Sequence, residues 1–200
     1  MVLSGPINQH KPFWDKGKKH IEIEDPTPVD RVLGRNHKFI QTEHGTTMQF
    51  GMKDFAEDAC KAYEELSGCT LKTASTPFLP EGSLVDSDFE TRGQMAGDAS
   101  KILMKIFWSV TLARPDLMEG KSDLTRRITT WSKADDRRLV HLMSYLKGTA
   151  GYVLEGRTFD DAKALRLCVY SYADHASGVE DVKSTSGMIL TLEGLNSFWP

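Results

Sequence analysis

Residues 165–192, LRLCVYSYADHASGVEDVKSTSGMILTL, decide the fold of the C-terminal part of this chain. Leu165, Leu167 and Val169 alternate with more polar residues. This period of two places an apolar row along one face of a β-strand. Residues 173–187 interrupt the pattern with Asp, Ser and Gly, which favour turns because they bond their own backbone or tolerate unusual φ angles.

A second apolar run over residues 188–192 predicts a return strand. Glu193 and Gly194 then predict a turn, and residues 195–199 predict a third strand. The whole stretch therefore indicates an antiparallel meander in which a long acidic loop joins the first two strands.

Two motifs flank the acidic loop: YSYAD at residues 170–174 and DVKSTSG at residues 181–187. Together they resemble the start of the ribonuclease H domain in copia-type LTR retrotransposon polyproteins, where YSDADWAG is followed after a short gap by DRKSTSG. The first Asp of that family pattern is its first catalytic metal ligand, and Tyr172 occupies this position here. The second acidic position is Asp174, which the resemblance makes the candidate metal ligand of this chain.

Further blocks resemble the same family in the same order along the chain. TPFLPEGSL at residues 76–84 resembles the linker after its thumb helix, ARPDL at 113–117 resembles its TRPDI, and YLKGT at 145–149 matches its YLKGT. Residues 32–50 are similar to its FLG segment, a hairpin that leads out of the polymerase palm. Separate blocks in the family's order are more specific than any single block.

The middle of the chain has helical periodicity. Apolar spacing predicts helices over residues 53–66, 93–112 and 123–131, with a break at Pro115 between the last two. The clearest amphipathic helix starts at a capping box formed by Ser132 and Asp135. Its apolar stripe is Leu139, Leu142, Met143 and Leu146, and it ends at Lys147 and Gly148, a cation and a C-cap glycine.

The N-terminal part predicts less regular structure. Residues 1–19 indicate a frayed lead-in, and residues 20–24 alternate like a short edge strand that the following prolines stop. Strand-like pieces at residues 32–34 and 38–42 lead through a turn to a return strand over residues 46–51.

Composition limits the class of protein. The chain has 200 residues, 40% hydrophobic and 26% charged, with a net charge of −3, so any nucleic-acid site must be local. It contains no apolar run near 18 residues, which predicts that it does not bind or cross a membrane. Its three cysteines are odd in number and lack C-x-x-C spacing, which favours a reducing intracellular location, cytoplasmic or nuclear.

These observations predict an α+β fold with a helical, thumb- and connection-like middle and a truncated antiparallel ribonuclease H-like sheet. Residues 1–52 would be a lead-in and short strands from the end of a reverse transcriptase palm. Residues 53–150 would form the helical region, and residues 151–200 the incomplete first strands of a ribonuclease H-like domain.

Catalysis by this chain alone is not expected. Ribonuclease H chemistry uses two metal ions, which several converging carboxylates must hold. The phenol of Tyr172 is neutral near pH 7 and cannot replace a carboxylate ligand, and the sequence ends before the family's later ligands. The resemblance implies Mg²⁺ for the intact family, but we expect no catalytic residue and no cofactor for this chain. No pair of adjacent aspartates stands where the family's polymerase would need it.

A local surplus of positive charge predicts a binding site for an RNA or DNA duplex. Such a surplus grips phosphates without reading sequence. The alternative interpretation is the ordinary solvated face of an amphipathic helix. The candidate binding residues are Arg126, Arg127, Lys133, Arg137, Arg138 and Lys147.

Three hypotheses follow. The first is a non-catalytic polyprotein fragment with, at most, weak sequence-independent nucleic-acid binding. The second is a segment of an RNA-directed DNA polymerase with ribonuclease H activity, active when joined to the rest of the polyprotein, and the third is a soluble interaction domain. The open strands also predict a mobile or aggregation-prone C-terminal third, which slow amide exchange throughout residues 165–199 would contradict.

Overall fold

The computed structural model describes residues 2–173, 184 and 186–200. The helices are α1 (Ile7–Gly17), α2 (Lys53–Ser67), α3 (Asp86–Glu90), α4 (Ala99–Leu112), α5 (Met118–Arg126) and α6 (Lys133–Gly148). The strands are β1 (Arg31–Val32), β2 (Arg35–Thr42), β3 (Gly45–Gly51), β4 (Val153–Thr158), β5 (Arg166–Ala173), β6 (Ser186–Glu193) and β7 (Phe198–Trp199). Helices and strands thus make an α+β fold, as the sequence predicts.

One antiparallel sheet joins both ends of the chain. Its strand order is β1-β2-β3-β4-β7-β6-β5, so β3 from the N-terminal part pairs with β4 from the C-terminal part. Phe50 lies opposite Leu154 in this pairing. The meander predicted for the C-terminus is present as β5, β6 and β7.

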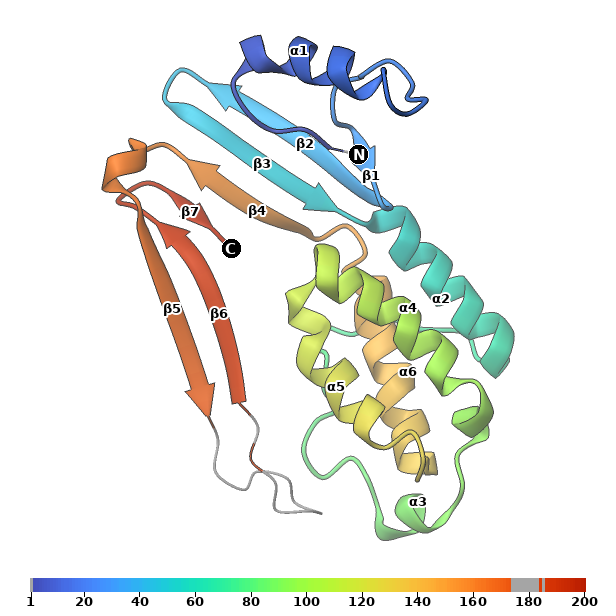
Figure 1. The fold of residues 1–200 in the computed structure, drawn as a ribbon. Coiled ribbons are helices and arrows are strands. Elements are labelled where there is room, and N and C mark those ends of the chain that lie inside the picture. Colours follow the sequence, from blue (N-terminus) through green and yellow to red (C-terminus); the bar gives the residue numbers. More distant parts are fainter. Residues whose placement is uncertain (1, 174–183, 185) are drawn as a thin grey trace.

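The main hydrophobic core lies inside a bundle of α2, α4, α5 and α6 (Figure 1). The stripe of α4 and the stripe of α6 are its centre: Ile102, Ile106, Leu139 and Leu146 are completely buried. Spacing of three and four residues places these side chains on one face of each helix, which explains why the two helices pack together. None of the helices in the described part of the chain is long and apolar enough to cross a membrane.

A second, small cluster connects the sheet to the bundle. Phe50, in β3, and Met52, between β3 and α2, are buried together with Ala113, which follows α4. Trp199 of β7 packs edge-on against Phe50, with ring centroids 5.8 Å apart. Gly156 permits this contact, because a Cβ atom there would lie 2.4 Å from the Trp199 ring.

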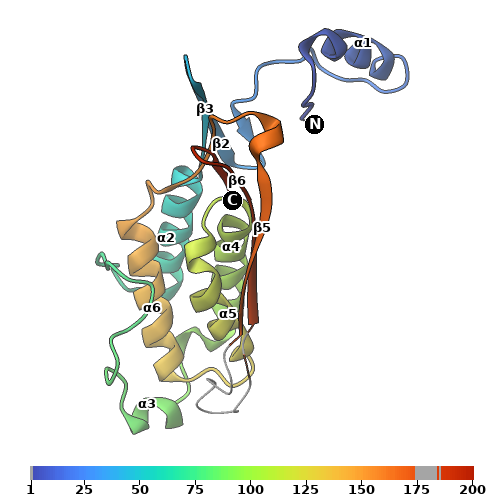
Figure 2. The same cartoon turned by 90° about the vertical axis from the view of Figure 1, so that its left-hand side faces the viewer.

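The β5–β6 pair is outside both clusters. It extends from the rest of the sheet down the side of the bundle, in both views (Figures 1 and 2). Leu167 is 68% exposed and Met188 73% exposed, so their apolar surface is in water. We call this pair, β5 with β6, the ribbon.

The helix predictions are largely confirmed. The helix predicted over residues 53–66 is α2, which ends before Gly68 in the left-handed conformation with φ 67°. The predicted capping box is present: the Ser132 backbone N–H donates to the Asp135 carboxylate at 2.9 Å, and α6 begins there. The helix predicted over residues 93–112 begins later, because residues Gln94–Gly97 form a 3-10 turn before α4.

Other expectations were wrong. The N-terminal lead-in contains α1, a helix with Pro12 inside it and no buried residue. Residues 20–24 do not form a strand: the Ile21 N–H donates instead to the Gly17 carbonyl at 3.1 Å, which continues the turn after α1.

Some boundaries moved. The helix predicted over residues 123–131 is α5, which starts directly after the Pro115–Leu117 turn and ends at Arg126. Strand β7 contains two residues instead of the predicted five. The acidic loop between the first two meander strands lies mostly outside the described residues.

Candidate nucleic-acid interface

Most of the predicted phosphate-binding side chains come from one end of the bundle. Arg126 and Arg127 lie at the C-terminal end of α5, and Lys133, Arg137 and Arg138 lie in the first two turns of α6. The structure does not bring Lys147 to this group. It lies 14 residues after Lys133, which corresponds to about 21 Å along the helix.

Two of these cations bind one buried carboxylate. Asp88, in α3, is 2% exposed, and the Lys133 ammonium lies 3.1 Å from its Oδ1 atom while Arg137 donates to Oδ2. Hydrogen bonds from Arg137 and Lys133 hold the pKa of the Asp88 carboxyl below its usual value. Asp88 therefore stays ionised and neutralises part of the predicted basic patch.

The other three arginines of the group, Arg126, Arg127 and Arg138, also have acidic partners. Arg138 donates to Asp135 at 2.9 Å, and Asp135 is itself buried. Arg126 and Arg127 each lie 3.4 Å from the Asp123 carboxylate. Phosphates would have to compete with these carboxylates, so the arrangement favours weak binding.

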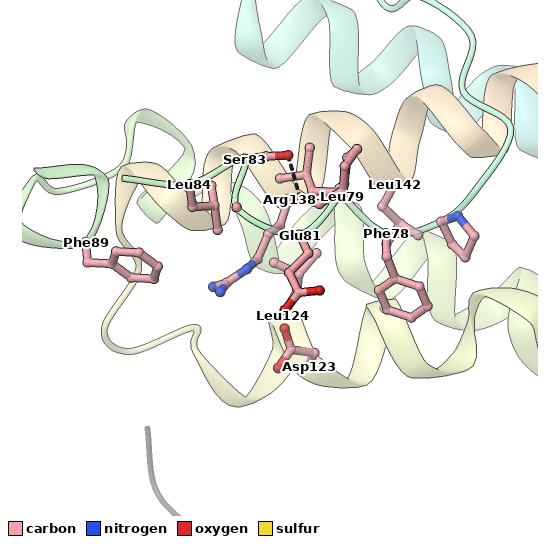
Figure 3. A pocket seen from close by; sticks show the side chains of 14 residues that line it. Phe78, Leu79, Glu81, Ser83, Leu84, Phe89, Asp123, Leu124, Arg138 and Leu142 are labelled. Atoms are coloured by element: carbon pink, nitrogen blue, oxygen red, sulfur yellow. Dashed lines mark hydrogen bonds between the residues drawn. The ribbon is translucent and has the colours of Figure 1, made fainter. Parts of the chain in front are cut away.

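A cavity of about 290 Å³ lies beside this group, below the loop over residues 77–84. Figure 3 shows the guanidinium of Arg138 pointing into the open space between Phe89 and the carboxylates of Glu81 and Asp123. The Arg138 guanidinium also lies 5.5 Å from the centre of the Phe89 ring, a cation–aromatic contact. Arg138 therefore contacts two side chains, the carboxylate of Asp135 and the ring of Phe89.

The sixth candidate, Lys147, joins the bundle helices instead of facing a common surface. Its ammonium lies 2.9 Å from the Glu64 carboxylate of α2 and donates to the Leu71 carbonyl at 3.0 Å. Hydrogen bonds from Lys147 and the Leu71 N–H lower the pKa of the Glu64 carboxyl. This lysine connects α6 to α2 and to the segment that follows α2.

Sequence reasoning missed a second polar cluster, in which the motif blocks ARPDL and YLKGT meet. Arg114 is 2% exposed and donates to the Thr149 carbonyl at 2.9 Å and to the Thr149 hydroxyl at 2.7 Å. It also forms a bidentate pair with Asp116, with contacts of 2.9 and 2.7 Å. The Tyr145 hydroxyl completes the network by donating to Asp116 at 2.9 Å.

The remaining residues of YLKGT have structural contacts as well. Leu146 is completely buried in the core of the bundle. A Cβ atom at Gly148 would lie 3.1 Å from the Ala74 carbonyl oxygen, so glycine lets the segment after α2 pass close to α6. The motif therefore holds α6 to its neighbours, and its roles became visible only when the distant partners were known.

Tyr172, which stands where the resembled pattern has its first metal ligand, lies on the ribbon. Tyr172, in β5, is 66% exposed and lies opposite Gly187 of β6. Asp174, the candidate metal ligand, lies outside the described residues. Among the residues that the structure does describe, no three His, Cys, Asp or Glu side chains converge as metal ligands would.

Comparison with known proteins gives one distant relative. The chain is 21% identical over 186 residues to the retrovirus-related Pol polyprotein from transposon TNT 1-94 of Nicotiana tabacum. The similarity covers 90% of this chain and 13% of that polyprotein, and it supports an origin in a retrotransposon polyprotein. No family model matches the chain, and no solved structure matches it.

Proposed function

We propose that this chain is a non-catalytic segment of a retrotransposon polyprotein. It contains the end of a reverse transcriptase, with thumb- and connection-like helices, followed by the first strands of a ribonuclease H-like domain. The observation that carries the proposal is the contact between Arg114 and Thr149. It gives a physical reason for two blocks of the family pattern, 35 residues apart, to occur together.

The absence of hydrolysis follows from the chemistry at Tyr172. A phenol is neutral near pH 7 and is a poor ligand for a hard divalent cation, which prefers carboxylate oxygens. The test incubates the purified chain with an RNA–DNA hybrid and Mg²⁺, alongside Tyr172→Asp. We expect no cleavage from either protein, because a two-metal site needs several converging carboxylates and the described residues contain no group of three His, Cys, Asp or Glu that could hold a metal ion. Cleavage by the unmodified chain that EDTA abolishes would overturn the proposal.

We further propose that the cations of α5 and the start of α6 bind a nucleic-acid duplex weakly and without sequence preference. Lys133 and Arg137 share Asp88, and Arg127 and Arg138 share Asp135, so these cations lie close together, which supports this function. Their acidic partners limit its strength. Lys147 is expected to contribute little, because it is distant from the group.

A salt titration tests the binding proposal. A labelled duplex is titrated with protein at several salt concentrations, and the logarithm of the binding constant should fall linearly with the logarithm of the salt concentration. Replacing Arg126 and Arg137 with Gln should reduce the slope by about 0.9 for each phosphate that the protein then leaves unneutralised. The matched control replaces Lys101 and Lys105 of α4 with Gln and should leave the slope unchanged. A binding constant that does not change with the salt concentration would contradict phosphate binding.

The hypothesis of an interaction domain keeps one specific observation in its favour, the exposed apolar surface of the ribbon. The hypothesis of a working enzyme segment predicts Mg²⁺-dependent cleavage once the remaining polyprotein is joined to this chain. If cleavage then requires Tyr172→Asp in addition, the non-catalytic proposal is supported over that alternative.

A further inference from the structure

The outer edge of the sheet at β5 is long and chemically unprotected. β5 pairs with β6 on one side, and within the described residues no strand pairs with its other side. Edge strands are usually protected by charged side chains, prolines, bulges or short length, because their backbone groups otherwise pair with another chain. β5 has eight residues, no proline and one charged residue, Arg166, at its start.

Both faces of this strand are also apolar or aromatic and exposed. Leu167 and Val169 lie on one face, and Tyr170 and Tyr172 on the other; all are more than half exposed. A two-stranded pair in water is marginally stable by itself, and three or more strands are needed for independent stability. A further strand with few charged residues, paired with β5, would therefore increase the stability of the ribbon most.

We propose that β5 pairs antiparallel with β5 of a second copy of this chain, with Val169 opposite Val169 of the second copy. This inference concerns self-association and does not depend on the proposed function. The register aligns seven residues of each strand, from Arg166 to Tyr172, and extends the sheet continuously from one copy into the other.

The side chains of this register are complementary. Arg166 of each copy lies opposite Tyr172 of the other, on the same face, where a cation and an aromatic ring attract each other. Leu167 lies opposite Ser171, and Cys168 lies opposite Tyr170. No like charges face each other, because Arg166 is the one charged residue of β5.

The geometry of the sheet also limits the assembly to two copies. At the other end of the sheet, β1 contains two residues, so it offers little backbone for pairing. A two-fold contact that uses the same strand on both copies occupies the long edge of each. The result is a closed dimer instead of a growing fibre.

The first experiment measures molar mass by light scattering over a range of protein concentrations. As the protein concentration rises, the molar mass of the unmodified chain should change from that of a monomer to that of a dimer. Val169→Lys places two lysines directly opposite each other and should weaken the dimer about tenfold or more, and Val169→Glu should do the same. Mixing these two variants should restore a dimer, because Lys then faces Glu. Val169 is 58% exposed, so both substitutions leave the packed core untouched.

Met188→Lys is the matched control. Met188 is exposed on the same face of the ribbon but lies on the inner strand β6, opposite Ser171 of its own copy. The Met188→Lys variant loses the same kind of apolar surface as Val169→Lys and gains the same charge. It should nevertheless dimerise like the unmodified chain, because Met188 is not on the edge strand. Equal weakening by Met188→Lys and Val169→Lys would overturn the edge pairing in favour of general apolar contact.

Cys168 reports the register directly. In the proposed dimer the two Cys168 residues are diagonal neighbours, about 7–8 Å apart, so a short thiol-to-thiol cross-linker should join two copies through them. Cys168→Ser should abolish the cross-link and Cys69→Ser should not. A single copy at every concentration, or species that grow without limit, would overturn the proposal.

Discussion

The helical bundle and the ribbon are both regular secondary structure, but they differ in what their side chains contact. In the bundle, α4 and α6 bury whole apolar stripes against each other and against α2 and α5. In the ribbon, the backbone groups of β5 and β6 pair over eight positions, while most of the apolar side chains on both faces are exposed. Backbone pairing therefore forms a strand pair without supplying a hydrophobic core.

This difference predicts that stability is concentrated in the bundle. Free energies of local opening follow buried contacts, and a region with few of them opens at little cost. The predictions below test the comparison by altering comparable residues in the two regions, beginning with the substitution of largest effect.

Leu139→Ala should destabilise the protein most. Leu139 is completely buried at the centre of the bundle, so the substitution loses transfer free energy and leaves a cavity, at a cost of about 2–5 kcal/mol. Urea denaturation followed by far-UV circular dichroism measures the change. A decrease in stability below about 1 kcal/mol would mean that the bundle is not the stabilising region.

Arg114→Met should cost about 3 kcal/mol, at the lower end of the range for breaking a buried ion pair. Met keeps the apolar stem but removes the donor of the Thr149 carbonyl and the cation that pairs with Asp116, which keeps the Tyr145 hydroxyl as a donor. The side chain of Asp116 is 34% exposed, so water can solvate part of its charge. The same denaturation assay applies, with Arg126→Met as the control on a surface ion pair, for which little change is expected.

The network around Asp116 should also make stability depend on pH. Burial tends to raise the pKa of this carboxyl, but the hydrogen bonds and charge of Arg114 outweigh it and hold the pKa below its usual value. The stabilisation is therefore present above the unfolded-state pKa of about 3.9 and is lost as the pH falls toward the lower folded-state pKa. Asp116→Asn should lower stability at pH 6 and reduce the loss between pH 5 and pH 3. Parallel curves for both proteins would contradict this role.

Leu190→Ala in the ribbon should have the smallest effect, within about 0.5 kcal/mol for the monomer. Leu190 is about half exposed and, although it is the same residue type as Leu139, has no second layer packed on it. Denaturation at low protein concentration gives the comparison. A loss as large as that of Leu139→Ala would show that the ribbon is buried in solution.

Some of the site was readable from sequence and some was not. The capping box of Ser132 and Asp135 was predictable because its partners are three residues apart. The role of Asp88 was not, because its partner Arg137 is 49 residues away and the pair depends on how α3 docks on α6. Five of the six predicted basic residues lie in α5, directly after it or in the first two turns of α6, while Lys147 does not join them, and sequence could not show that Asp88, Asp123 and Asp135 pair with them.

The N-terminal errors have a similar explanation. The alternation at residues 20–24 predicts a strand, yet a strand needs a neighbour, and here the chain continues the turn after α1. The lead-in was predicted to be frayed, but α1 forms there with Pro12 inside it, since an exposed helix loses little by lacking one backbone donor.

The sequence by itself determined the elements whose signals are local: the helices α2, α4 and α6, the β2–β3 hairpin and the C-terminal meander. It also determined that the side chain at residue 172 is a phenol and not a carboxylate. The tertiary structure alone decided that β3 pairs with β4 to make one sheet from the two ends of the chain, that Arg114 joins two motif blocks, and that the ribbon remains exposed. These features depend on contacts between residues far apart in sequence, and periodicity carries no information about such partners.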